Sequence, residues 1–190
     1  MAKHHPRVIK KIMSCKSRNE RNRLITKWKR EPKTHYLMTT RFNSDTHDQM
    51  LNYCSKSAKI RCAYGSYTPM AAYLPQDVMM FVLEMNNDKN KIMGIGLIRN
   101  TLSTKKHFVY NENVYNTYTY IGSTRIDRSE MTEEEEAVMT ICDNVCFKGM
   151  FHQKRCKAVT VFPVDVHEKY KDEDDFDLTE FVRNMFLNRI

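Results

Sequence analysis

Two apolar runs joined by a short polar turn constrain the fold of this chain more than any other feature. The runs DVMMFVLEM (77–85) and KIMGIGLIRN (91–100) are rich in residues that favour strands, and the five residues NNDKN between them are typical of a turn. This pattern predicts a β-hairpin. Both runs are apolar enough for the hairpin to be central in a sheet.

Further strands and helices are predicted on both sides of the hairpin. Aromatic and β-branched runs predict strands over 35–42, over 114–126 and within 151–164. Apolar spacing and cap signals predict helices over 17–30, over 45–56 behind an N-cap at Ser44, from Thr132 to Gly149, and over 177–190. The fold class expected from this order is α+β, with a small mixed, barrel-like β-sheet and flanking helices.

The helix start at Thr132 has the most specific local signal. Glu135 follows Thr132 by three residues, which is the spacing of a capping box, and acidic residues at 133–136 suit the positive end of a helix dipole. Gly149 is a suitable terminator. A helix of about fourteen residues is therefore expected here.

Charge divides the chain into three segments. Residues 1–33 hold twelve Lys or Arg against Glu20 and Glu31, a net +10, although the whole chain is only +8. Residues 165–180 hold eight acids against two lysines, a net −6. The predicted organisation is a basic N-terminal arm (1–33), an α+β domain (34–164), and an acidic segment with a C-terminal helix (165–190).

Several classes of protein are excluded. Hydrophobic residues make up 41% of the chain, which is too many for a wholly disordered protein. No apolar run reaches the roughly 18 residues of a membrane span, and the charged start MAKHHPRVIKK is unlike a signal peptide. We expect a soluble intracellular protein with no membrane partner, whose six cysteines stay reduced. The many Met, Asn, Lys and Tyr residues are typical of an AT-rich genome, such as that of a large DNA virus.

The sequence contains no recognisable catalytic constellation, and no cofactor is expected. Gly94 and Gly96 lie inside a predicted strand, whereas a phosphate-binding loop places its glycines before a helix. A loose zinc-ligand pattern, C-x3-C-x5-H-x3-C, is formed by Cys142, Cys146, His152 and Cys156. The alternative is that the two helical cysteines belong to a buried apolar stripe.

Basic and aromatic residues favour nucleic-acid binding. The residues expected to contact phosphates are Lys10, Lys11, Arg18, Arg21, Arg23, Lys27, Lys29 and Arg30 of the arm, with Lys154 and Arg155 in a second cluster. Lys105 and Lys106 form a third cluster. Trp28 either anchors the arm or stacks on a base. A base pocket is expected from Phe42, Tyr64, Tyr67 and Tyr73 beside Gly94 and Gly96.

The segments HYLMTTRFNSDTHDQMLNYCSKS, VMMFVLEMNNDKNKIMGIGLIRN and YTYIGSTRID resemble the PUA-like superfamily, especially its YTH and EVE branches, over residues 34–164. The resemblance implies a small β-barrel that binds nucleic acid, often at a modified base in an aromatic cage. Such cages use tryptophans, and the matching region has none, so Phe42, Tyr64 and Tyr67 would take that place. The predicted function is a non-enzymatic nucleic-acid-binding module for RNA or DNA.

Two alternatives stay open. The run IMGIGLI also resembles the central hairpin of GCN5-related acetyltransferases, but KGMFHQKRCKAV (148–159) lacks the glycines of their pyrophosphate loop. A third class is a structural or virion protein that uses its basic arm against the acidic segment or a partner. Thermal stabilisation by acetyl-coenzyme A would support the enzyme, and a stable protein complex would support the structural role.

Overall fold

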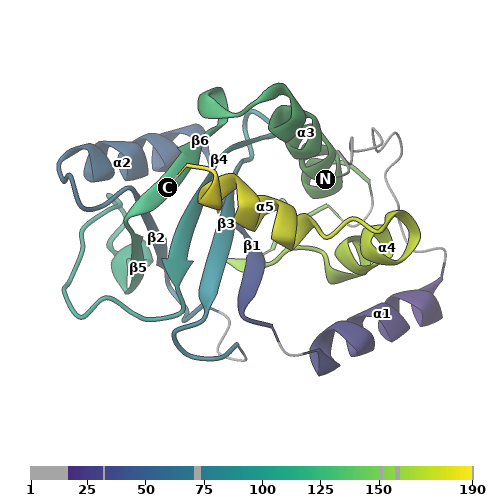
Figure 1. The fold of residues 1–190 in the computed structure, drawn as a ribbon. Coiled ribbons are helices and arrows are strands. Elements are labelled where there is room, and N and C mark those ends of the chain that lie inside the picture. The colour runs from purple at the N-terminus through teal and green to yellow at the C-terminus, as the bar shows by residue number, and fades with distance from the viewer. Residues whose placement is uncertain (1–16, 32, 71–73, 150–151, 157–158, 190) are drawn as a thin grey trace.

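A computed structural model describes residues 17–31, 33–70, 74–149, 152–156 and 159–189, which form an α+β fold (Figure 1). The five strands of the main sheet are β1 (His35–Phe42), β3 (Met79–Asn86), β4 (Lys91–Arg99), β6 (Thr124–Asp127) and β7 (Thr160–Val161). Their order is β6-β4-β3-β1-β7. The sheet is mixed, because β1 runs parallel to β3 while the other neighbours are antiparallel.

A second sheet of two antiparallel strands consists of β2 (Cys62–Ser66) and β5 (Tyr118–Gly122). It packs against the main sheet and shares no ladder with it among the described residues. The predicted barrel is therefore wrong: a barrel closes one hydrogen-bonded sheet on itself, whereas these strands form two separate sheets.

Several sequence predictions of local structure are confirmed, including the helices expected over 17–30 and 177–190. The central hairpin is β3 and β4, with Val82 opposite Gly96 and with β1 and β6 as outer neighbours. The strand over 35–42 has the predicted bounds. Helix α3 (Glu133–Phe147) begins with the expected capping box, in which the Thr132 side chain accepts a hydrogen bond from the Glu135 backbone N–H.

Other elements differ from the predictions. Helix α2 (Ser44–Ser55) is capped by Asn43 in place of Ser44, because the Asn43 side chain accepts a hydrogen bond from the Thr46 backbone N–H. The single strand predicted over 114–126 is divided into the short helix η1 (Asn113–Asn116), β5 and β6. The chain passes from one sheet to the other at Gly122, where a Cβ atom would lie 2.1 Å from the Leu97 carbonyl oxygen.

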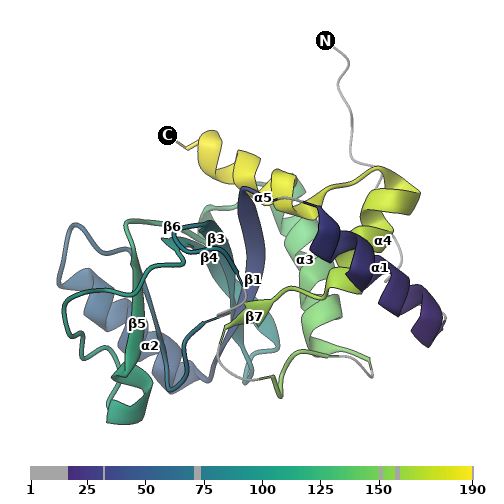
Figure 2. The same ribbon diagram turned by 90° about the horizontal axis from the view of Figure 1, so that it is seen from below.

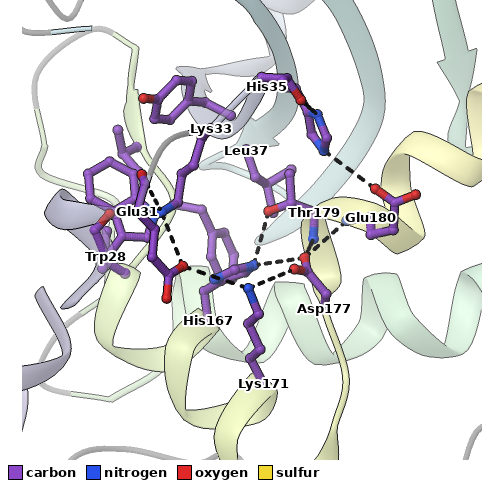
Figure 3. A pocket seen from close by; sticks show the side chains of 15 residues that line it. Trp28, Glu31, Lys33, His35, Leu37, His167, Lys171, Asp177, Thr179 and Glu180 are labelled. Atoms are coloured by element: carbon purple, nitrogen blue, oxygen red, sulfur yellow. Dashed lines mark hydrogen bonds and ion pairs between the residues drawn. The ribbon is translucent and has the colours of Figure 1, made fainter.

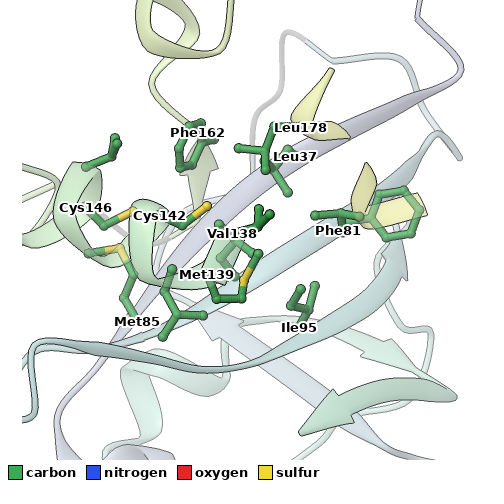
Figure 4. Packing of buried hydrophobic residues seen from close by; sticks show 14 of the residues in the cluster. Leu37, Phe81, Met85, Ile95, Val138, Met139, Cys142, Cys146, Phe162 and Leu178 are labelled. Atoms are coloured by element: carbon green, nitrogen blue, oxygen red, sulfur yellow. The ribbon is translucent and has the colours of Figure 1, made fainter. Parts of the chain in front are cut away.

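Helices cover one face of the main sheet. Alternate strand residues such as Phe81, Leu83 and Met85 point to this face. They pack against α3 and against α5 (Leu178–Leu187), whose N-cap is Asp177. Figure 4 shows Phe81 and Met85 together with Cys142 and Cys146 of α3.

The opposite face is covered by α2 and the two-stranded sheet. Met80 and Val82 alternate with the residues above and pack in the second cluster with Met50, Tyr64 and Tyr120. The described residues therefore form three layers, with the main sheet in the middle. None of their helices is long and apolar enough to cross a bilayer.

The acidic C-terminal segment is part of the fold. Helix α4 (Val164–Asp174), which the sequence patterns did not predict, buries Val166 and Tyr170 in the same cluster as α3 and α5. Helix α1 (Arg18–Arg30) packs chiefly against α4, and both views show the two helices side by side at one end of the molecule (Figures 1 and 2). The core thus continues beyond residue 164, where a domain boundary was predicted.

Candidate nucleic-acid interface

The residues of the predicted base pocket lie largely in the core. Phe42 is 4% exposed and Tyr64 is 1% exposed, so their rings have no free face for a base. A Cβ atom at Gly94 would lie 2.6 Å from Arg125 Nη2, and one at Gly96 would lie 1.9 Å from Tyr64 Oη. The glycines therefore accommodate neighbouring side chains, which corrects the prediction. Tyr67 is exposed, and Tyr73 lies outside the described residues.

A buried ionic network takes the place of that pocket. Glu84 of β3 is fully buried and accepts hydrogen bonds from Arg125 Nη2 at 2.7 Å and from Tyr64 Oη at 2.8 Å, while His47 Nε2 lies 3.5 Å away. Burial works to raise the pKa of Glu84, but the nearby His47 side chain and the charge and hydrogen bonds of Arg125 outweigh it and keep the pKa below its usual value. Because these residues come from α2, β2, β3 and β6, the network joins the two sheets.

The four residues of the loose zinc pattern are separated by burial. Cys142 and Cys146 are enclosed in the core, and burial raises the pKa of the Cys142 thiol to about 12. Cys156 is exposed and donates to the Gln153 side chain, while His152 Nδ1 accepts from the Lys154 backbone N–H. Within the part of the chain that the structure describes, no three His, Cys, Asp or Glu side chains are placed so that they could hold a metal ion.

The arm residues of α1 divide between two helix faces. Arg21 and Lys27 point toward α4 and pair with acids there. The other predicted phosphate contacts on this helix are exposed: Arg18, Arg23, Lys29 and Arg30. Lys10 and Lys11 lie outside the described residues. In the second cluster, Arg155 is exposed and Lys154 donates to the Asn90 side chain at 2.8 Å.

Trp28 has the contacts of an anchor. Its ring meets Tyr36 of β1 edge-on, with the ring centroids 5.6 Å apart. The Lys33 ammonium lies 4.9 Å from the centroid of the Trp28 ring. These contacts attach the end of α1 to the first strand, so of the two roles predicted for Trp28 the structure favours anchoring.

A small pocket beside this anchor, with a volume of about 220 Å³, lies between α1, β1, α4 and α5 (Figure 3). Its charged lining residues pair with one another. Lys171 Nζ lies 3.4 Å from Asp177 Oδ2, and His35 Nε2 lies 3.6 Å from Glu180 Oε2. Because the charges of its walls are compensated from within, this pocket is better explained as a junction between helices than as a site for a charged ligand.

The His167–Asp177 pair at this junction should make the free energy of unfolding depend on pH. Burial alone would lower the pKa of His167, but hydrogen bonds with Asp177 and Glu168 outweigh it and raise the pKa; His167 in turn holds the pKa of Asp177 well below its usual value. The Asp177 contribution is present above the unfolded-state pKa and is lost as the pH falls. The His167 contribution is present below its unfolded-state pKa and is lost as the pH rises. The pair therefore stabilises most between about pH 4 and 6.5.

We expect Asp177→Asn to flatten this pH profile at both ends, because Asn can still cap α5 but has no charge. Urea denaturation between pH 3 and 8 measures the effect. Asp174→Asn, at an exposed position of α4, is the matched control and should keep the wild-type profile. An unchanged profile in Asp177→Asn would show that the pair has no such role.

A groove of different character lies along the loop that follows β4. It has a volume of about 520 Å³ and is lined by residues 102–107, 113 and 116–119. The lining includes Lys105, Lys106 and His107, several hydroxyl and amide side chains, and no Asp or Glu among its described residues. Such a lining offers hydrogen-bond donors and positive charge to an anionic ligand.

The loop is held in one conformation by buried hydrogen bonds. Asn116, which is 5% exposed, accepts from the backbone N–H groups of Val109 and Tyr110 and donates to the Tyr110 carbonyl at 2.7 Å. The Ser103 backbone N–H donates to the Thr119 carbonyl of β5, and the Ser103 hydroxyl contacts His107. The groove is thus formed before any ligand arrives.

Exposed apolar side chains belong to the same loop as the groove lining or are adjacent in sequence to its neighbouring strand. Phe108 is 62% exposed and Tyr115 is 36% exposed. Leu102, Val114 and Tyr67 are also exposed, and Tyr67 follows Ser66, which pairs with Tyr118 at the groove. Among the described residues, only Leu187 on α5 is another large exposed hydrophobic residue. An apolar surface this concentrated is typical of an interaction site.

A cation and an aromatic ring lie together at this surface. Lys106 Nζ is 4.9 Å from the centroid of the Phe108 ring. The Lys105–Lys106 pair was visible in the sequence. Phe108 and Tyr115 were missed, although aromatic residues in an otherwise polar loop could have indicated them.

Comparisons of this chain with protein-family models, curated proteins and solved structures gave no match. Its function is therefore inferred from its own geometry.

Proposed function

We propose that this protein binds single-stranded nucleic acid in the groove of residues 102–119. Lys105 and Lys106 contact phosphates, and the rings of Phe108 and Tyr115 stack on unpaired bases. The observation that supports this most is a preformed groove with lysines and no described carboxylate in its lining, together with the exposed Phe108 ring beside Lys106.

The kind of nucleic acid follows from the exposed rings. Bases in a duplex are stacked on one another, whereas bases of a single strand can stack on aromatic side chains. The exposed face of α1 adds phosphate contacts through Arg18, Arg23 and Lys29. Either RNA or DNA satisfies this chemistry.

The double variant Lys105→Ala/Lys106→Ala tests the phosphate contacts. We expect weaker binding and a dependence of log K on log salt that is shallower by about 1.4, since each single-strand phosphate contact contributes about 0.7. Fluorescence anisotropy with a labelled 15-nucleotide strand over a potassium chloride series measures both. Lys59→Ala/Lys89→Ala removes two exposed lysines outside the groove lining and is the control of equal charge.

Phe108→Ala separates base stacking from phosphate contact in the same assay. It should weaken binding of the natural strand about tenfold, because base–aromatic stacking is worth roughly 1–3 kcal/mol, and leave binding of an abasic strand unchanged. The proposal is rejected if the wild-type protein binds neither RNA nor DNA at low salt, or if the groove and control lysine variants lose affinity equally.

A further inference from the structure

Helix α1 is held to the fold mainly by charge. Arg21 Nε lies 3.3 Å from Asp165 Oδ2, and Lys27 Nζ lies 2.6 Å from Asp172 Oδ1. Two further ion pairs have their base on α4: Lys169 pairs with Glu20 of α1, and Lys171 pairs with Glu31, just after α1. The strongly basic and strongly acidic segments of the sequence therefore neutralise each other across one helix pair.

The apolar part of this contact is small. Among the described residues of α1, Leu24 alone is buried, and Trp28 is half-buried at the C-terminal end of the helix. The Lys27–Asp172 pair is open to water and salt, with side chains 41% and 38% exposed, whereas the Arg21–Asp165 pair is more enclosed, since Asp165 is only 8% exposed. An ion pair as exposed as Lys27–Asp172 is worth no more than about 1 kcal/mol, and another anion can replace its carboxylate at little cost.

The ligand proposed for this protein is such an anion. Phosphates accept the same charge-assisted hydrogen bonds from Arg and Lys as carboxylates do, and their contacts gain further free energy from counterion release. Exposed Arg18, Arg23 and Lys29 attract a polyanion to α1 before Arg21 and Lys27 are released.

We propose that the carboxylates of α4 are an internal competitor for nucleic-acid phosphates at α1. In the absence of nucleic acid α1 is docked on α4; when a strand is bound, Arg21 and Lys27 exchange carboxylates for phosphates and α1 leaves α4. The inference rests on the proposed function and adds regulation to it, since docking sets how much positive charge the protein offers.

Asp172→Asn tests the competition in the full chain. Asp172 is paired with Lys27, so its neutralisation should raise affinity for the 15-nucleotide strand up to about fivefold, the range expected for one exposed ion pair. Asp174→Asn changes net charge equally at an exposed position nearby and should raise affinity less. Lys27→Ala combined with Asp172→Asn should abolish the gain.

Trp28 supplies a second measurement, because it is the only Trp of the chain and lies where α1 meets β1. Inorganic polyphosphate, which has no bases to quench fluorescence, should shift the emission of the wild-type protein to longer wavelength as α1 undocks. The inference is overturned if wild-type protein binds nucleic acid but Asp172→Asn binds no more tightly than Asp174→Asn, or if emission stays constant at saturating polyphosphate. Absence of nucleic-acid binding would instead overturn the proposed function.

Discussion

Replacing Glu84 by Gln should lower the free energy of unfolding by about 3–5 kcal/mol, the usual cost of removing one partner from a buried ion pair. The Arg125 side chain is 9% exposed and directs both Nε and Nη2 at the Glu84 carboxylate. A neutral amide leaves that guanidinium without its closest charge partner. Equilibrium urea denaturation at pH 7, followed by circular dichroism, measures the loss.

A surface ion pair supplies the control for this experiment. Arg99 Nη1 lies 3.3 Å from Asp77 Oδ2, and both side chains are more than half exposed. Asp77→Asn should cost less than about 1 kcal/mol, since exposed pairs contribute little. Asp77 also has a positive φ of 61°, which Asn tolerates well. If Glu84→Gln lowers the free energy of unfolding no more than Asp77→Asn does, the network does not stabilise the junction between the sheets.

Replacing both charged partners should be less harmful than removing one. The double variant Glu84→Met/Arg125→Met has no unpaired buried charge. Its loss in free energy of unfolding should therefore be smaller than the sum of the losses in the two single variants. Loss equal to that sum would indicate that the two side chains act independently, against their 2.7 Å contact.

Gly96→Ala is expected to destabilise the protein by about 1–3 kcal/mol through overpacking. The added Cβ would lie 1.9 Å from Tyr64 Oη and 2.7 Å from Cys62 Sγ, so β2 must move away from β4 or the Tyr64 hydroxyl must leave Glu84. Thermal unfolding and urea denaturation both detect this change.

Gly149→Ala is the control for Gly96→Ala, because it introduces backbone strain without crowding. Gly149 has a φ of +79° at the end of α3, and a Cβ there would meet nothing within 4 Å. Its cost, about 1 kcal/mol, comes from the left-handed backbone alone. Tyr64→Phe in the Gly96→Ala background should recover part of the loss, because it removes the closest atom. An equal cost at both glycines, with no recovery, would contradict the packing explanation.

Local sequence patterns were sufficient to predict those elements whose structure depends on residues close together in the sequence. The hairpin depends on two β-rich runs and the turn between them, and the start of α3 depends on Thr132 and Glu135, three residues apart. Helix α4 was not predicted, because its acidic residues resemble a solvated tail. Only Val166 and Tyr170, through their packing on α3 and α5, identify it as part of the core.

The candidate site could be predicted only in part, for a similar reason. Lys105 and Lys106 are adjacent in sequence and mark a basic loop. Exposure of an aromatic ring, however, depends on which elements pack against it. Tyr64 is enclosed because the two sheets meet over it, whereas Phe108 projects into solvent although the next residues of its loop, Val109 and Tyr110, are buried in the core.

Local sequence patterns alone specify the central hairpin and the uneven distribution of charge, +10 over residues 1–33 and −6 over 165–180. Tertiary structure decided where these features lie: two separate sheets in place of a barrel, and α1 docked on α4. The physical reason is distance along the chain. Turn and cap signals act over a few residues, but the Lys27–Asp172 pair joins residues 145 positions apart, and only the folded core brings them together.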